Sequence, residues 1–136
     1  MPRLSPVAAF LFGAGFASCT PGVLVSPSSG SIPIACRPLA LTDSERSTSA
    51  KLRAEVAGAV TASAELADGY RFNLRPDAVV FAHAAEWIAL ERRCCPFLSF
   101  DLAWTPGDDA APTITLTGPE GTKGFLAEEL PELPQK

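Results

Sequence analysis

The chain has 136 residues, of which 47% are hydrophobic and 19% are charged, and its formal net charge is −4. This length suits one compact domain with a single core and leaves no room for a second. Its 11 basic residues are dispersed, whereas nucleic-acid binders cluster lysine and arginine to contact phosphates. The sequence therefore predicts no nucleic-acid partner.

Residues 1–19 have the layout of an export signal. Arg3 precedes an apolar run from Val7 to Ala17, and Phe16-Ala17-Ser18-Cys19 approximates a lipoprotein cleavage box. This interpretation predicts a lipid anchor at Cys19 and a place in the cell envelope. The apolar run is too short to span a membrane, so no transmembrane helix is expected.

A competing interpretation is that translation starts further in, near Val23–Val25, which would place the protein in the cytoplasm. Residues 20–31 are rich in Pro, Gly and Ser, as in a flexible linker. Residues 1–31 are thus expected to be either a signal segment with a linker or a misassigned start, and residues 32–130 to form the domain.

Two elements are expected at the start of the domain. Ile32–Cys36 is a short apolar run that could form an edge strand, since Pro33 has no donor for a central ladder. Thr42-Asp43-Ser44-Glu45 is a capping-box pattern, and apolar residues follow at helical spacing. The pattern predicts a helix from Asp43 to Gly58.

A β-hairpin and a second helix follow. Apolar and polar residues alternate on both sides of Asp68-Gly69, which predicts the hairpin. Pro76-Asp77 then opens a helix that runs to Cys94 or Cys95. Its spacing places an apolar face and Glu91 on one side, together with one of the two cysteines. A carboxylate there needs a partner, either a backbone amide or an arginine such as Arg71 or Arg75.

The pattern repeats in the rest of the chain. Alternation over 98–104 and 114–116 predicts a second hairpin, and Gly118-Pro119-Glu120 starts a last helix to about Leu130, followed by a disordered tail over 131–136. The expected fold is α+β: an antiparallel sheet of four or five strands from two β-hairpins, with three helices on its apolar face, in the order (β)-α-ββ-α-ββ-α.

The adjacent thiols of Cys94 and Cys95 are the main chemical feature. They could form a strained disulfide, bind a soft metal or metalloid, or pack as small apolar groups. Arg92 and Arg93 beside them favour thiolates, but the negative end of the helix dipole opposes this, so the sign of the pKa shift is open. His83 lies about 16 Å away along the helix and is expected outside the site.

The stretch from Ile34 to Leu130 resembles a group of small bacterial proteins that carry the motif Glu-Arg-x-Cys-Cys-Pro-Phe and have no assigned activity. Four stretches carry the resemblance: Ile34–Cys36, Asp68–Phe72, Glu86–Phe97 and Leu116–Gly121. It implies that Cys36, Glu91, Cys94 and Cys95 belong to one recurring pattern. It implies no function.

Three interpretations of these residues remain open. The first is a site for Hg, As or Cu ions with Cys94, Cys95 and Cys36 as ligands; zinc fits less well, because it normally takes four ligands and only Glu91 offers a fourth. The second is a thiol redox protein or sensor in which Cys94 or Cys95 attacks and Cys36 resolves. The third is a non-catalytic interaction module with structural cysteines. Hydrolase and nucleotide motifs are missing from the sequence.

Overall fold

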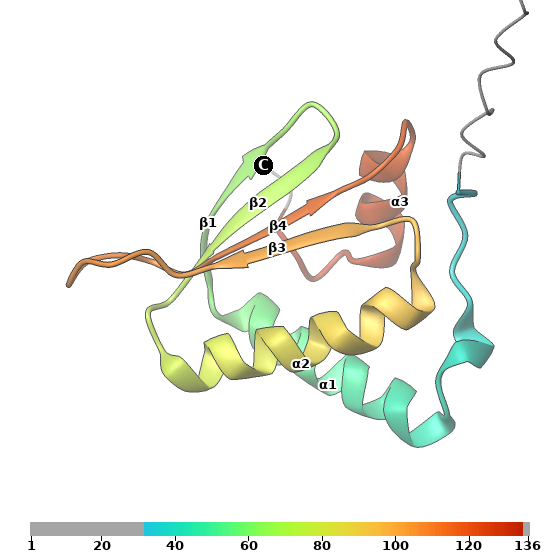
Figure 1. Ribbon diagram of the computed structural model, residues 1–136, viewed down its shortest axis with the longest axis horizontal. Coiled ribbons are helices and arrows are strands. Elements are labelled where there is room, and N and C mark those ends of the chain that lie inside the picture. Colours follow the sequence, from blue (N-terminus) through green and yellow to red (C-terminus); the bar gives the residue numbers. More distant parts are fainter. Residues whose placement is uncertain (1–31, 135–136) are drawn as a thin grey trace, which may run out of the picture.

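Three α-helices and a four-stranded antiparallel sheet make up residues 32–134, the part of the chain that the computed structural model describes (Figure 1). The elements in chain order are the 3₁₀-helix η1 (Pro38–Ala40), α1 (Asp43–Gly58), β1 (Val60–Glu65), β2 (Gly69–Leu74), α2 (Ala78–Cys94), β3 (Ser99–Ala103), β4 (Thr113–Thr117) and α3 (Thr122–Glu129). The predicted α+β class and both hairpins are confirmed.

The strand order is β1-β2-β4-β3, so β2 and β4 form the centre of the sheet. Apolar residues alternate along both central strands and are buried: Tyr70, Phe72, Leu74, Ile114 and Leu116. Because successive side chains of a strand point to opposite faces, the paired residues Arg71 and Thr115 lie on the other, polar face. Buried residues from all three helices belong to the same core as the buried residues of β2 and β4. They are Leu52, Val56, Val80, Ala84, Trp87 and Leu126. Figure 1 shows α1 and α2 side by side along the sheet.

The start of α1 follows directly from its sequence. The hydroxyl of Thr42 accepts a hydrogen bond from the Glu45 N–H at 3.2 Å, and the Glu45 carboxylate accepts one from the Thr42 N–H at 2.8 Å. This capping box satisfies two of the amide groups that a helix start leaves without intrahelical partners. The helix spans Asp43–Gly58 as predicted.

Helix α2 begins and ends where its capping residues require. The Asp77 carboxylate accepts hydrogen bonds from the amides of Val79 and Val80, at 2.8 and 3.4 Å. The helix ends at Cys94, and the Cys95 N–H still donates to the Glu91 carbonyl at 2.6 Å. Pro96 cannot continue the ladder because it lacks an N–H.

The predicted inward face of α2 is confirmed. Val80, Ala84, Trp87 and Glu91 are its buried residues, spaced three or four apart. The Trp87 side chain is 0% exposed, and its ring meets that of Phe100 edge-on with centroids 6.3 Å apart. Trp87 therefore anchors α2 to the sheet.

The optional strand at Ile32–Cys36 is absent from the described chain, which has four strands. This segment instead passes the end of α2, where the Arg37 N–H donates to the Cys94 carbonyl at 2.7 Å. Ile34 and Cys36 pack partly against the core. The apolar residues that predicted a strand are thus used in packing, and their backbone pairs with a helix end.

Packing also continues past the expected boundary at Leu130. Leu133 is 3% exposed and joins the core, and Glu132 pairs with Arg53 at 3.2 Å. The predicted tail over 131–136 therefore contains residues of the packed domain, because burial of the Leu133 side chain holds this segment in place. The predicted signal, the lipid anchor at Cys19 and the linker lie outside the described residues. Within the described chain, no helix has the length and apolar character needed to cross a membrane.

Candidate metal centre

Three cysteines from two distant parts of the chain converge at the end of α2. The Sγ atoms of Cys36, Cys94 and Cys95 all lie within 4.8 Å of one another. Adjacent residues in a regular helix point about 100° apart, which would separate the two neighbouring thiols. Cys95 leaves the helical conformation, with φ −114° and ψ 75°, because Pro96 follows it. The break in the helix brings both sulfurs to one place.

Cys36 reaches the cluster through its backbone neighbour. The hydrogen bond from the Arg37 N–H to the Cys94 carbonyl fixes the segment against the last turn of α2. The last carbonyl groups of a helix accept no hydrogen bond from an amide of the same helix, so the Cys94 carbonyl is free to accept one from Arg37. The same bond thus aligns the third thiol with the first two.

The spacing suits a shared ion. Sulfurs that bind one ion at about 2.3 Å are about 3.8 Å apart in a tetrahedral site and about 4.0 Å apart in a planar three-coordinate site. Separations of up to 4.8 Å require only a small inward movement to reach these values. Thiolates prefer soft ions such as Hg(II), As(III) and Cu(I).

Glu91 is buried beside the cluster, with 7% of its surface exposed. Its Oε1 accepts hydrogen bonds from Ser49 Oγ at 2.7 Å and from Trp87 Nε1 at 3.1 Å. Its Oε2 faces the Cys95 thiol, which donates to it over 3.7 Å. Among the described residues, the cluster of candidate ligand atoms consists of the three sulfurs and does not include the Glu91 carboxylate.

The partner of Glu91 differs from the one expected. The sequence predicts a backbone amide or an arginine such as Arg71 or Arg75, but Arg75 pairs with Asp77 at 3.6 Å and Arg71 is exposed. The hydroxyl of Ser49 takes this place because it lies on the face of α1 that packs against α2. The sequence contains no signal for Ser49, since one serine among many in a helix is not distinctive.

Two of the thiols are held in the protonated form. Burial raises the pKa of Cys36 to about 11, and the charges of Cys94 and Glu91 act in the same direction, while a hydrogen bond with Cys95 opposes them. Burial also raises the pKa of Cys95, as do its hydrogen bond with Cys36 and the same neighbouring charges. The sign that the sequence left open is therefore upward for Cys95.

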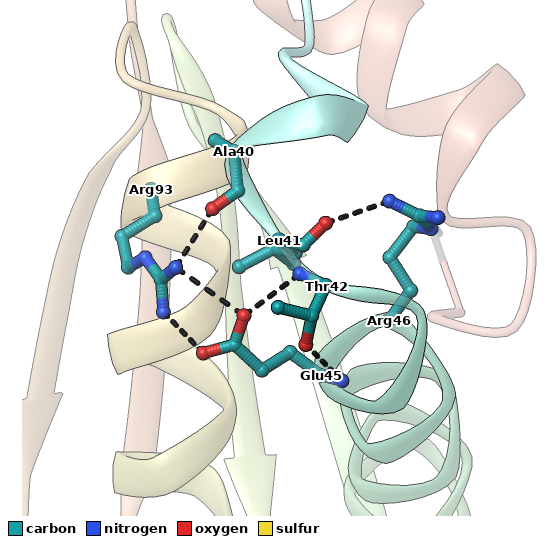
Figure 2. A network of polar contacts seen from close by, with 6 residues as sticks. All are labelled: Ala40, Leu41, Thr42, Glu45, Arg46 and Arg93. Atoms are coloured by element: carbon teal, nitrogen blue, oxygen red, sulfur yellow. Dashed lines mark hydrogen bonds and ion pairs between the residues drawn. The ribbon is translucent and has the colours of Figure 1, made fainter.

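Arg93 does not act on the thiols because it is engaged elsewhere (Figure 2). Its Nη1 donates to Glu45 Oε1 at 2.6 Å, and its Nη2 donates to the Ala40 carbonyl at 2.7 Å. Arg46 donates from Nη1 to the carbonyls of Pro38 and Leu41, at 2.8 and 2.7 Å. Both arginines thus hold the segment that follows Cys36, a positioning role that the sequence does not reveal.

A pocket of about 310 Å³ opens onto the cysteines. Besides the three cysteines, its wall contains apolar, polar and charged side chains: Pro38, Leu41, Arg46, Ser49, Ala50, Arg53, Glu91, Leu98, Phe125, Glu129 and Leu130. His83 is not in this wall and pairs with Glu55 at 2.6 Å. The structure therefore places His83 apart from the cluster, as predicted.

Comparison of the chain with protein-family models, with curated proteins and with solved structures found no match.

Proposed function

We propose that the protein binds a soft metal or metalloid ion through the thiolates of Cys36, Cys94 and Cys95. The observation that supports this most directly is that three sulfurs, from two distant parts of the chain, lie within 4.8 Å of one another at a pocket. Zinc fits this set less well, because the carboxylate that could serve as a fourth ligand, Glu91, already accepts two hydrogen bonds.

The charge of the bound ion favours As(III) among the soft ions. Three thiolates form a neutral complex with As(III), a complex of charge −1 with Hg(II) and one of charge −2 with Cu(I). A net charge in a partly buried site is costly unless it is paired. The carboxylate of Glu91 is already close to Cys95, and Arg93 is turned toward Glu45. The neutral complex therefore suits this environment best.

The two alternatives have less support from the site. A redox cysteine that attacks quickly has a lowered pKa, whereas burial raises the pKa of Cys95, which disfavours Cys95 as the attacking thiol. Cysteines that serve only in packing are expected to be fully buried, whereas Cys36 and Cys94 are half-buried and line the pocket.

Titration of the reduced protein with As(III) and with Hg(II) tests the proposal. Sulfur-to-metal absorption and competition with a small dithiol report the affinity. We expect tighter binding than the free dithiol gives, a loss of tight binding in Cys94→Ser and Cys95→Ser, and a smaller loss in Cys36→Ser. His83→Ala is the control and should bind normally, since His83 lies outside the site. An affinity no better than that of the dithiol, unchanged by Cys36→Ser, would exclude the proposed site.

A further inference from the structure

The pocket at the cysteines is larger than a bare ion requires. A water molecule takes up about 30 Å³ in the liquid, and an ion that binds three sulfurs directly needs no more than that. The pocket measures about 310 Å³, which falls at the lower end of the range for small organic ligands, about 300–1,000 Å³. The volume indicates a ligand with atoms beyond the ion.

The wall of the pocket has the composition of an organic-ligand site. Its four large apolar side chains are Leu41, Leu98, Phe125 and Leu130. Phe125 is held by an edge-on contact with Phe97, with ring centroids 4.8 Å apart. This apolar part of the wall would bury an apolar group of a ligand favourably.

Arg53 adds a polar feature to this wall. Its Nε is buried and has no hydrogen-bond partner among the residues that the structure describes, although its Nη2 pairs with Glu132 at 3.2 Å. The guanidinium of Arg53 belongs to a residue that lines the pocket, so it is a donor to which a ligand with an acceptor group could bind. Arg46, the other arginine of the wall, already donates to two carbonyls and to Asp43.

We infer, on the basis of the proposed function, that the ligand is a trivalent arsenical that carries an organic substituent. The substituent lies against the apolar wall and presents a hydrogen-bond acceptor to the guanidinium of Arg53. Binding is an exchange without oxidation or reduction: R–As(OH)₂ and two of the three cysteine thiols give R–As(S-Cys)₂ and two molecules of water. The third cysteine remains a thiol, because the substituent takes the third bond of arsenic, whereas arsenite has three bonds for all three sulfurs. The carbon–arsenic bond is kept, and arsenic remains trivalent.

Three probes that differ only in the substituent test this inference: arsenite, methylarsonous acid and phenylarsonous acid. The affinity of the protein for each probe is measured by competition with a small dithiol. The ratio of the protein's affinities for two probes is then divided by the ratio of the dithiol's affinities for the same two probes, so that intrinsic arsenic–sulfur chemistry cancels. We expect the protein to prefer the phenyl over the methyl compound by at least about tenfold after this correction, because the phenyl group fills more of the apolar pocket. No preference would overturn the inference while leaving arsenite binding, and with it the proposed function, intact.

Ala50→Leu is the variant that fills the pocket. Ala50 lines the pocket from an exposed position on α1, and leucine is a good helix former, so folding should be preserved. We expect it to remove the phenyl preference and to leave arsenite binding unchanged. Ala54→Leu is the matched control, one turn along the same helix and outside this pocket, and it should keep the preference. An equal loss of arsenite and phenylarsonous acid in Ala50→Leu would contradict a separate place for the substituent.

The role of Arg53 is tested with 3- and 4-carboxyphenylarsonous acids. We expect one of these isomers to bind several-fold more tightly than the phenyl compound, and we expect Arg53→Met to abolish that gain without weakening phenyl binding. A gain that survives in Arg53→Met, or the absence of a gain for both isomers, would show that Arg53 recognises no acceptor.

Discussion

Two glutamates connect α1 and α2 near the cysteines, and they do so in opposite ways. Glu45 lies at the surface on α1 and pairs with the guanidinium of Arg93 on α2 at 2.6 Å (Figure 2). Glu91 lies on α2 and is buried, and its Oε1 accepts from the neutral hydroxyl of Ser49 on α1 at 2.7 Å. One carboxylate is paired with a cation, and the other is held in place by neutral donors.

The contact of Glu45 with Arg93 positions a segment of the backbone, whereas Glu91 affects the ionisation of the thiols. The pair between Glu45 and Arg93 removes the nearest arginine from the thiols and uses it to hold the segment before α1. The carboxylate of Glu91 lies next to the thiols and adds to the rise in the pKa of Cys36 and of Cys95. Arg93, which directly precedes the cysteines in the sequence, is therefore not paired with them.

The largest expected effect is on stability and follows removal of the Trp87 side chain, which lies in the core and donates a hydrogen bond to Glu91. Trp87→Ala should lower the free energy of unfolding by about 3–5 kcal/mol, because it empties a fully buried site and removes the indole donor of Glu91. Urea denaturation measures this. Trp104→Ala is the matched control, since Trp104 is 40% exposed, and it should cost less than about 1 kcal/mol. Equal costs for both tryptophans would refute the assignment of Trp87 as the anchor of α2.

A smaller effect is expected for Glu91 itself. Glu91→Ala should cost about 1–3 kcal/mol, because it leaves the buried donors of Ser49 and Trp87 without an acceptor. Glu91→Gln retains an acceptor oxygen and should cost less. It also removes the negative charge, so the pKa of Cys36 should fall from about 11, as measured by the pH dependence of alkylation. If that pKa stayed unchanged in Glu91→Gln, the carboxylate would have no electrostatic effect on the thiols.

The thiols should make the ion-free protein less stable at alkaline pH. An ordinary cysteine loses its proton near pH 9.0, whereas Cys36 keeps it up to about pH 11. Between these values the native state binds more protons than the unfolded state, so stability falls as pH rises. Cys36→Ser should show a shallower decrease over this interval in thermal unfolding experiments. A decrease of the same slope in both proteins would assign the effect to other groups.

The smallest effect is expected for the surface pair. Hydrogen bonds from Arg93 and then from the Thr42 amide lower the pKa of Glu45 from 4.5 to about 2. Its contribution to stability is complete above pH 4.5 and is lost as the pH falls to about 2. Glu45→Gln should reduce the acid sensitivity of unfolding over this interval, and added salt should narrow the difference because the pair is exposed. Glu128→Gln, an exposed control on α3, should keep the sensitivity of the parent protein.

Much of the fold could be predicted because it follows from local patterns. The capping box at Thr42 and Glu45, the alternation in both hairpins and the apolar spacing of α2 each specify structure over a few residues. The strand order could not be predicted, because it depends on how β2 and β4 meet across a long stretch of chain. The prediction of an edge strand at Ile32–Cys36 was wrong for a related reason. The apolar residues of this segment fit a strand, but its backbone pairs with the end of a helix.

The candidate site was partly predictable. The adjacent cysteines and the carboxylate one turn before them are close in sequence, so their proximity follows from helix geometry. The convergence of Cys36 on this pair was a hypothesis, and the sulfur positions support it. Ser49 and Arg53 had no local signal at all. Their roles depend on which face of α1 meets α2 and the pocket, which is a property of the tertiary packing.

The backbone hydrogen bond between Arg37 and Cys94 has a consequence for cooperativity. It tethers Cys36 beside the other two thiols, so its sulfur acts at a high effective concentration and completes the coordination without a separate encounter. Linkage then requires the reverse effect: an ion held by all three sulfurs stabilises the docked position of residues 32–41 to the same degree that docking strengthens ion binding. The order of this N-terminal arm would thus report on whether the site is filled.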